Sequence, residues 1–169
     1  MPDDAQFTIL IPIYNDWDSL RLFLKEIEGA LAANKLSAEV MIINDGSTTA
    51  HPFTEEQASA FHSFEIVHLR RNLGHQRAIT TGLTYIFARN NSKPVLVVDG
   101  DGEDRAEDIP RLWRKFQQSE PGKIVFAERT RRSEGLLFTT LYKTYQGLHL
   151  LLTGLPVKIG NFSLIPFER

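Results

Sequence analysis

Short apolar segments alternate with longer amphipathic ones along most of this chain. Residues 7–14, with the sequence FTILIPIY, are apolar almost throughout, which is typical of a β-strand that is buried on both faces. Later segments show a similar pattern, and we predict further strands over residues 38–45, 63–69, 94–101 and 122–129. Strands of this kind are found inside parallel sheets, where helices cover both faces.

Amphipathic helices are predicted between these strands. After the first strand, apolar residues recur every three or four positions, which predicts a helix over residues 17–34. Further helices are predicted over residues 74–90 and 107–118. Because strands that alternate with helices form a mostly parallel sheet, we expect an α/β fold with helices on both faces of the sheet. No repeat or linker interrupts the pattern, so residues 1–169 are expected to form a single domain.

The last part of the chain departs from this alternation. Residues 135–156 are apolar on much of the circumference of a predicted helix. We expect this helix to pack in the core or against a second copy of the chain in a homo-oligomer, because its basic content is low for a helix that lies on a membrane surface. The pattern over residues 158–169 predicts a final strand without a capping signal after it, which is compatible with a natural chain that continues further.

The composition argues against several classes of binding partner and metal site. The chain has 19 Lys and Arg against 21 Asp and Glu, a net charge of −2, which argues against nucleic acid as a partner. It has no cysteine, which excludes disulfides and thiolate metal sites. No apolar run reaches the roughly 18 to 20 residues of a membrane span, and the acidic N-terminus lacks a signal-peptide pattern. We therefore expect a cytoplasmic protein.

Polar and mostly acidic residues follow three of the predicted strands. These residues are Pro12, Tyr14, Asn15 and Asp16, then Asn44, Asp45, Gly46 and Ser47, and then Asp99, Asp101, Glu103 and Asp104. The ligand crevice of a parallel α/β sheet lies at the carboxyl ends of the strands, so these groups should converge. Carboxylates that lie close together raise each other's pKa unless a cation lies between them. We therefore expect Mg²⁺ or Mn²⁺ at this edge, with open positions for a diphosphate.

The acidic residues are also compatible with several different structures. Residues 99–104 could form a solvated turn, and Asp45 could be a helix cap or turn residue. An EF-hand would need glycine where Asp104 stands, and a helix before the loop. The haloacid-dehalogenase phosphatases also have two aspartates separated by one residue, as Asp99 and Asp101 are, but too little chain follows here for their later motifs. A dinucleotide-binding fold would need a glycine-rich motif after the first strand, and none is present.

Six motifs stand in the order and at the spacing of a known family. They are IPIYND, IINDGST, RRNLGHQRAITTGL, VVDGDGEDRAEDIPRLW, FAERTRRSEG and IGNFSLI. In these motifs the chain resembles the family 2 glycosyltransferases, which have the GT-A fold with a mostly parallel, Rossmann-like sheet. Within that family it is most similar to the polyprenyl-phosphate sugar transferases, that is, the dolichol-phosphate mannose synthase group and its bacterial relatives. The resemblance extends from Phe7 to Ile165.

The resemblance implies an inverting, metal-dependent transferase of cell-envelope glycan synthesis. Such an enzyme moves a sugar from a UDP- or GDP-linked donor to an acceptor, here a polyprenyl phosphate, so the protein would be cytoplasmic or peripheral to the inner face of the membrane. Pro12, Tyr14 and Asp16 would border the nucleoside of the donor. Asp45 would reach the base or the ribose.

The resemblance also implies contacts to the metal and the diphosphate. Asp99 and Asp101 would be the D-x-D pair, with Asp101 as the more direct metal ligand, and Glu103 would be close enough to join the coordination sphere. His75 and Gln76 open the helix after the third strand, where they would contact donor phosphate or merely cap the helix. The implied cofactor is Mg²⁺ or Mn²⁺.

Four further residues would take part in the transfer step. Arg129 and Arg132 match a pair of arginines placed to meet phosphate charge. By itself the segment RTRR would indicate an exposed basic turn, but in the context of the six motifs we favour the contact with phosphate. Asp104 is the spare acid that could act as a base. Asn161 stands where many lipid-phosphate relatives have aspartate, and a neutral amide cannot take a proton from an acceptor. Two alternatives stay open: transfer to a saccharide hydroxyl, for which Asp104 would have to be the base, and a domain that binds a sugar nucleotide without transferring it, which the neutral Asn161 suggests.

Overall fold

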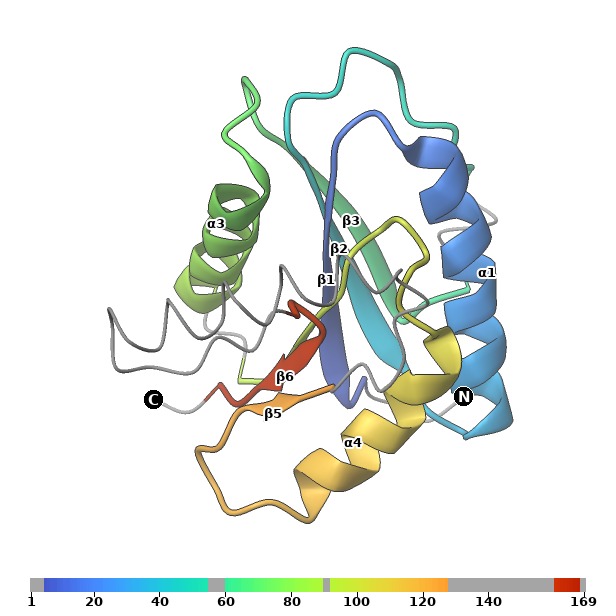
Figure 1. The fold of residues 1–169 in the computed structure, drawn as a ribbon, viewed down its shortest axis with the longest axis vertical. Helices are drawn as coiled ribbons and strands as arrows, with labels where there is room; N and C mark the ends of the chain where they lie inside the picture. The colour runs from blue at the N-terminus through green and yellow to red at the C-terminus, as the bar shows by residue number, and fades with distance from the viewer. Residues whose placement is uncertain (1–4, 55–59, 90–91, 128–159, 168–169) are drawn as a thin grey trace, which may run out of the picture. The chain divides into compact units, whose positions relative to one another are not determined.

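The computed structural model describes residues 5–54, 60–89, 92–127 and 160–167. The strands are β1 (Phe7–Ile13), β2 (Ala38–Asn44), β3 (Ser63–His68), β4 (Val95–Val97), β5 (Val125–Phe126) and β6 (Ser163–Ile165). The helices are α1 (Trp17–Ala33), α3 (His75–Ala88) and α4 (Ile109–Gln117), the last preceded by a short 3₁₀ helix, η1 (Ala106–Asp108). Figure 1 shows these elements around the sheet. Each predicted strand and helix within the described residues is present, which confirms the expected α/β fold.

The sheet has six strands in the order β3-β2-β1-β4-β6-β5. Strand β1 pairs in parallel with β2 and β4, and β2 pairs in parallel with β3, whereas β6 runs antiparallel to β4 and β5. In the β4–β6 pair, Val97 lies opposite Ser163. If this register is extended by two residues, Asp99 lies opposite Asn161. The antiparallel strand therefore brings a residue from the end of the chain to the carboxyl end of β4.

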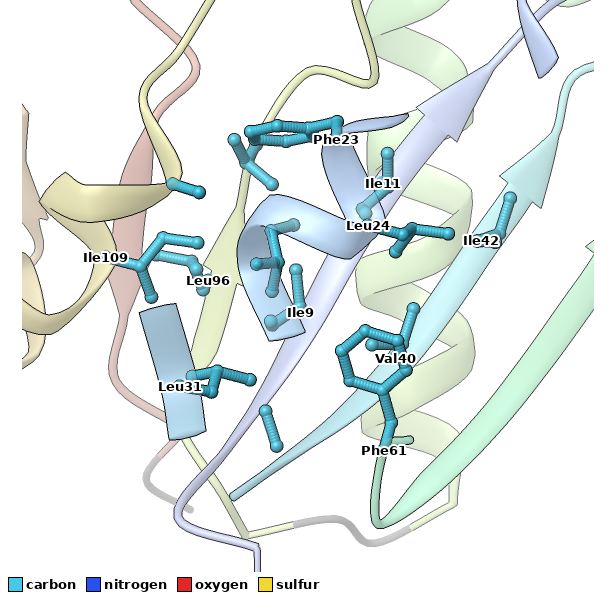
Figure 2. Packing of buried hydrophobic residues seen from close by; sticks show 14 of the residues in the cluster. Ile9, Ile11, Phe23, Leu24, Leu31, Val40, Ile42, Phe61, Leu96 and Ile109 are labelled. Atoms are coloured by element: carbon cyan, nitrogen blue, oxygen red, sulfur yellow. The ribbon is translucent and has the colours of Figure 1, made fainter. Parts of the chain in front are cut away.

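The core has two layers, one on each face of the sheet. Side chains of a strand alternate between faces, so Ile9 and Ile11 of β1 pack toward α1 and α4, while Leu10 packs toward α3. Figure 2 shows the first layer, in which Phe23 and Leu24 of α1 lie over the strands. Strands β1 and β4 are buried along their whole length, which explains why their segments of the sequence are almost entirely apolar.

Some predictions fall outside the described residues. They are the helix over residues 135–156 and the two arginines Arg129 and Arg132. Strand β4 is shorter than predicted because the chain leaves the sheet before Asp99, so the acidic residues lie in a loop. In the part of the chain that the structure describes, no helix has the length and apolar character needed to cross a membrane.

Candidate functional site

A hollow of about 360 Å³ lies at the carboxyl ends of β1 and β4. It is lined by Pro12, Ile13, Tyr14, Asp16, His75, Asp99, Gly100, Asp101 and Asn161. These residues come from the end of β1, the start of α3, the loop after β4 and the segment before β6. Seven of them were selected from the sequence as donor, metal or transfer residues. The structure thus brings together residues that lie up to about 150 positions apart in the chain.

Asn161 lines this hollow and contacts side chains from two other parts of the fold, the loop after β4 and the start of α3. Its Nδ2 lies 3.3 Å from both Oδ1 and Oδ2 of Asp99 and 2.8 Å from Nε2 of His75. Its Oδ1 accepts a hydrogen bond of 3.1 Å from Nε2 of Gln76. His75 Nε2 also lies 3.1 Å from Asp99 Oδ1. One amide side chain therefore bridges the loop after β4 and the first turn of α3.

The carboxyl group of Asp99 is partly buried, and burial raises its pKa because the charged form loses solvation. His75 and the hydrogen bond from Asn161 act in the opposite direction, while the neighbouring carboxylates Asp101 and Asp104 raise the pKa further. The net effect is a raised pKa. A cation near Asp99 would favour its ionised form, so this environment is suited to a positively charged ligand.

A divalent metal fits the chemistry of the hollow, but its ligands are not assembled in advance. No group of three or more acidic or histidine side chains is arranged to hold a metal ion among the described residues. Asp101 is exposed, and its Oδ1 accepts a hydrogen bond of 2.9 Å from the backbone N–H of Glu103. Mg²⁺ commonly uses one or two carboxylates together with substrate phosphates and waters. Asp99 and Asp101 can supply such a partial set.

Two residues selected from the sequence have surroundings different from those expected. Asp104 is buried, with 5% of its surface exposed, and it is not among the described residues that line the hollow. Asp45 is also buried, with 3% exposed, and its carboxylate accepts hydrogen bonds from the backbone N–H groups of Leu73 and Gly74. Their roles as a base and as a nucleoside contact stay predictions.

Asn15 received no role from the sequence, although it fixes two loops beside the hollow. Its Oδ1 accepts a hydrogen bond of 2.8 Å from the backbone N–H of Thr48, and its own N–H donates to Ser47 Oγ at 2.9 Å. Its backbone has a φ of 61°, a left-handed conformation that asparagine tolerates better than most residues. A polar residue directly after a strand and before a helix is the only sequence signal for this role.

A second hollow of about 550 Å³ lies at the opposite edge of the sheet. It is lined by residues from the end of α1, the start of β2 and the segment before β3, including Leu31, Leu36 and Phe61. Its lining is mostly apolar, with Glu28 and Lys35 as its charged residues, and it includes none of the residues selected from the sequence. The first hollow therefore offers more polar partners to a charged ligand.

Comparison with known proteins identifies the family. Residues 8–168 match the profile of Glycosyl transferase family 2. The chain is 28% identical over 171 residues to the uncharacterized glycosyltransferase YkcC of Bacillus subtilis, a match that covers 98% of this chain and 50% of that protein. It is also 28% identical over 155 residues to an undecaprenyl-phosphate 4-deoxy-4-formamido-L-arabinose transferase of Klebsiella pneumoniae, which covers 90% of this chain and 46% of that protein. The chain thus spans about half the length of these curated relatives.

The fold is also that of a solved glycosyltransferase. The mannosyltransferase PcManGT from Pyrobaculum calidifontis, in complex with GDP-Man and Mn²⁺, is similar with a TM-score of 0.54 and 21% identity, over 76% of this chain and 37% of that chain. At this identity the similarity shows the fold alone, and it confirms the expected GT-A fold. The family match favours a glycosyltransferase over the phosphatase alternative. Because this match extends over nearly the whole sequence, the chain belongs to Glycosyl transferase family 2.

Proposed function

We propose that this chain is the donor-binding and catalytic domain of an inverting glycosyltransferase. It would move a sugar from a UDP- or GDP-linked donor to a polyprenyl phosphate. The observation that carries the proposal is the hollow in which Asp99, Asp101, His75 and Asn161 meet at the carboxyl edge of the sheet. The family match and the relative that acts on undecaprenyl phosphate support the reaction class.

A divalent cation would complete the donor site. When bound, Mg²⁺ or Mn²⁺ would be held by Asp99 and Asp101, with Glu103 nearby, and would supply positive charge that stabilises a leaving diphosphate. The raised pKa of Asp99 supports this proposal, because carboxylates that are crowded and partly buried gain most from a cation. The solved mannosyltransferase with the same fold was determined with Mn²⁺.

Side chains on β1 and α3 would hold the rest of the donor. Tyr14 is 48% exposed at the rim of the hollow and offers an aromatic surface to the nucleoside, with Pro12 and Asp16 beside it. His75 and Gln76 lie at the first turn of α3, where they would face donor phosphate. Arg129 and Arg132 would add positive charge for the same phosphates.

The neutral Asn161 favours a phosphate acceptor over a sugar hydroxyl. An acceptor phosphate is already an anion at neutral pH, so one of its oxygens can bond to the anomeric carbon while the bond from that carbon to the diphosphate breaks. In-line attack would invert the anomeric centre, and the nucleoside diphosphate would leave. A hydroxyl acceptor would need a base, and the available Asp104 is buried. Because polyprenyl phosphates lie in the membrane, the domain would work at its cytoplasmic surface.

The test has two stages, binding and transfer. Thermal unfolding is followed with UDP, GDP and their common sugar conjugates, each with and without Mn²⁺. A ligand at about 100 times its Kd stabilises the folded state by about 2.7 kcal/mol, which gives a clear rise in Tm. We expect a rise with one nucleotide that depends on Mn²⁺. The matching sugar nucleotide is then incubated with undecaprenyl phosphate in detergent, and the lipid-linked sugar is measured.

The results of the two stages distinguish the proposed function from a different acceptor and from a domain that binds without transfer. Binding without transfer to undecaprenyl phosphate, but with transfer to a saccharide, would contradict the proposed acceptor. Binding without any transfer would favour a domain that only holds a sugar nucleotide. No change in Tm with any nucleotide would contradict the proposed function itself. An Asp18→Asn variant, which removes an exposed acid of α1 outside the hollow, is the matched control for loss of charge.

A further inference from the structure

Asn15 has a backbone conformation that few residues other than glycine adopt. Its φ is 61°, and in the part of the chain that the structure describes Lys35 is the only other non-glycine residue with a positive φ. Lys35 follows the C-cap of α1, where the N–H groups of Lys35 and Leu36 donate to carbonyl oxygens of the last helical turn. A left-handed residue is common at that place in a helix. Asn15 follows a strand, so the end of a helix does not explain its conformation.

Hydrogen bonds to the turn after β2 hold Asn15 in this conformation. The N–H of Asn15 donates to Ser47 Oγ at 2.9 Å. Its Oδ1 accepts hydrogen bonds from the backbone N–H of Thr48 at 2.8 Å and from the Thr48 hydroxyl at 3.2 Å. A non-glycine residue keeps a left-handed conformation where the surrounding structure fixes it, and here both the backbone and the side chain of Asn15 are engaged. Asn15 therefore joins the turn after β1 to the turn after β2.

Contacts on either side of Asn15 connect the same two segments. The N–H of Asp45 donates to the carbonyl oxygen of Ile13 at 2.9 Å. The indole Nε1 of Trp17, the first residue of α1, donates to the carbonyl oxygen of Thr49 at 3.1 Å. Asn15 lies between these two contacts, so the two turns run side by side. The position of one turn thus depends on the position of the other.

The two turns carry the residues that we assign to the nucleoside. Tyr14 and Asp16 flank Asn15 and line the hollow, whereas Asn15 is not among the described residues of that lining. The side chain of Tyr14 is exposed, so packing in the core does not fix its ring. Asp45, at the start of the other turn, is the residue that the resemblance places at the base or the ribose. A nucleoside that contacts both turns needs them at one separation.

We propose that Asn15 is a positioning residue for the nucleoside of the donor. By joining the turns after β1 and β2, it holds Tyr14 and Asp45 at the separation that a bound nucleoside requires, a role that rests on the proposed function. Without this connection the two turns must be ordered when the donor binds, and the loss of conformational entropy lowers the affinity. The transfer step takes place at the other end of the donor. Loss of Asn15 should therefore raise KM and leave kcat nearly unchanged.

The first experiment measures binding of UDP or GDP, with Mn²⁺, to two variants of Asn15. Asn15→Gly allows the left-handed backbone without strain but removes the side-chain acceptor. Asn15→Asp keeps an acceptor oxygen for the N–H and hydroxyl of Thr48. We expect Asn15→Gly to raise Kd and KM by about 10-fold, while kcat changes less than about twofold. The Kd of Asn15→Asp should stay within about threefold of the wild-type value.

Lys35→Gly is the matched control for the change in the backbone. It also replaces a left-handed residue with glycine, at the end of α1 and outside the hollow at the carboxyl ends of β1 and β4. Its Kd for UDP or GDP should equal that of the wild type. If this variant bound as weakly as Asn15→Gly, a general change in chain flexibility would account for both results, and the proposal would be wrong.

NMR spectra test the connection without any ligand. The indole N–H of Trp17 bonds to the turn after β2, whereas Trp113, the other tryptophan of the chain, packs against Phe7. In Asn15→Gly we expect the indole signal of Trp17 to shift and the N–H of Thr48 to exchange faster with solvent, while the indole signal of Trp113 stays in place. Asn15→Asp should keep the wild-type behaviour of Trp17 and Thr48. Unchanged Trp17 and Thr48 signals in Asn15→Gly would contradict the proposal.

Two binding results would overturn the positioning role. Wild-type affinity in Asn15→Gly would show that the two turns keep their separation without Asn15. Binding by Asn15→Asp that is as weak as that by Asn15→Gly would show that the amide contacts the donor directly. If the Asn15 variants do not fold, hydrogen exchange in the wild type decides, because rapid exchange of the Thr48 N–H would mean that its bond to Asn15 is not maintained.

The wild type is measured first, so that failure of this inference can be distinguished from failure of the proposed function. If the wild type binds neither UDP nor GDP, the proposed function fails and the positioning role fails with it. If the wild type binds and Asn15→Gly binds equally well, only the positioning role is wrong.

Discussion

Asp99 lies in the loop that follows β4, with its side chain 23% exposed and its carboxyl group next to His75 and Asn161. Its pKa is raised in the folded protein, mainly by burial. The folded state therefore keeps the proton of Asp99 to a higher pH than the unfolded state does. As pH rises from the unfolded-state pKa to the folded-state pKa, this group removes stability, and the loss remains at neutral pH. Ionised Asp99 thus weakens the fold in the absence of a cation.

An Asp99→Asn variant should gain stability in the absence of a ligand but lose the binding of the cation. Without metal, we expect it to unfold at a higher temperature than the wild type at neutral pH, because the ionisation that costs stability is gone. The difference should shrink as the pH falls toward the pKa of Asp99. Addition of Mn²⁺ with UDP or GDP should raise the Tm of the wild type but not that of the variant. A variant that is less stable than the wild type at neutral pH would contradict the assignment.

Asp101 is exposed, so its contribution should be to ligand binding and not to folding. Asp101→Asn keeps the oxygen that accepts from the Glu103 N–H but removes the charge. We expect metal-dependent turnover of the sugar nucleotide to fall by about 100-fold or more. The free energy of unfolding should change by less than about 0.5 kcal/mol, as for other exposed sites. Steady-state kinetics and chemical denaturation measure the two quantities, and full activity in the variant would exclude Asp101 as a metal ligand.

At the scale of elements, Gly46 determines how closely the turn after β2 approaches the segment before α3. Gly46→Ala introduces a Cβ within 2.6 Å of backbone atoms and places alanine at a φ of 73°. The backbone strain alone should cost about 1–3 kcal/mol of unfolding free energy, and the contact should add to this cost. Denaturant unfolding monitored by circular dichroism measures the change.

Gly29 provides the matched control for this substitution. It lies within α1, where a Cβ would meet no atom within 4 Å. Gly29→Ala should therefore raise the unfolding free energy by about 0.5–1 kcal/mol, through the better helix propensity of alanine. Equal effects of the two substitutions would show that the loop before α3 can move away from the turn. The close contact at Gly46 would then not determine the position of that loop.

The elements themselves could be predicted from hydrophobic pattern alone. The apolar spacing of residues 17–34 predicted α1 to within one residue, because its buried positions follow a single helical face. The pattern could not give the direction of β6. This strand of three residues lies between β4 and β5, and its mainly apolar side chains could be buried there whether it ran parallel or antiparallel to β4. It also could not give the length of β4, which ends at Val97 although the apolar run extends to Val98 and its partner β1 continues to Ile13.

At the scale of the whole molecule, the position of the hollow followed from the sequence but its internal contacts did not. The rule that ligands bind at the carboxyl ends of parallel strands is enough to place Tyr14, Asp99 and Asp101 at one edge of the sheet. Asn161 was selected only from its resemblance to a motif, since nothing local to the sequence indicates that it meets His75. The hydrogen bonds from the Leu73 and Gly74 N–H groups to Asp45 could not be predicted either, because backbone donors and acceptors are not visible in a pattern of side chains.

The two hollows at opposite edges of the sheet give a final prediction about where the donor binds. The hollow of about 550 Å³ at the amino edge is the larger, but a nucleoside diphosphate with its cation needs charged and polar partners, and these line the hollow of about 360 Å³. With UDP or GDP and Mn²⁺, hydrogen exchange should slow around Tyr14, His75 and Asp99 and stay unchanged around Leu31 and Phe61. Both regions belong to the same sheet, so the amino edge serves as an internal control for general stabilisation. Protection confined to the amino edge would place the ligand in the apolar hollow and would refute the proposed donor site.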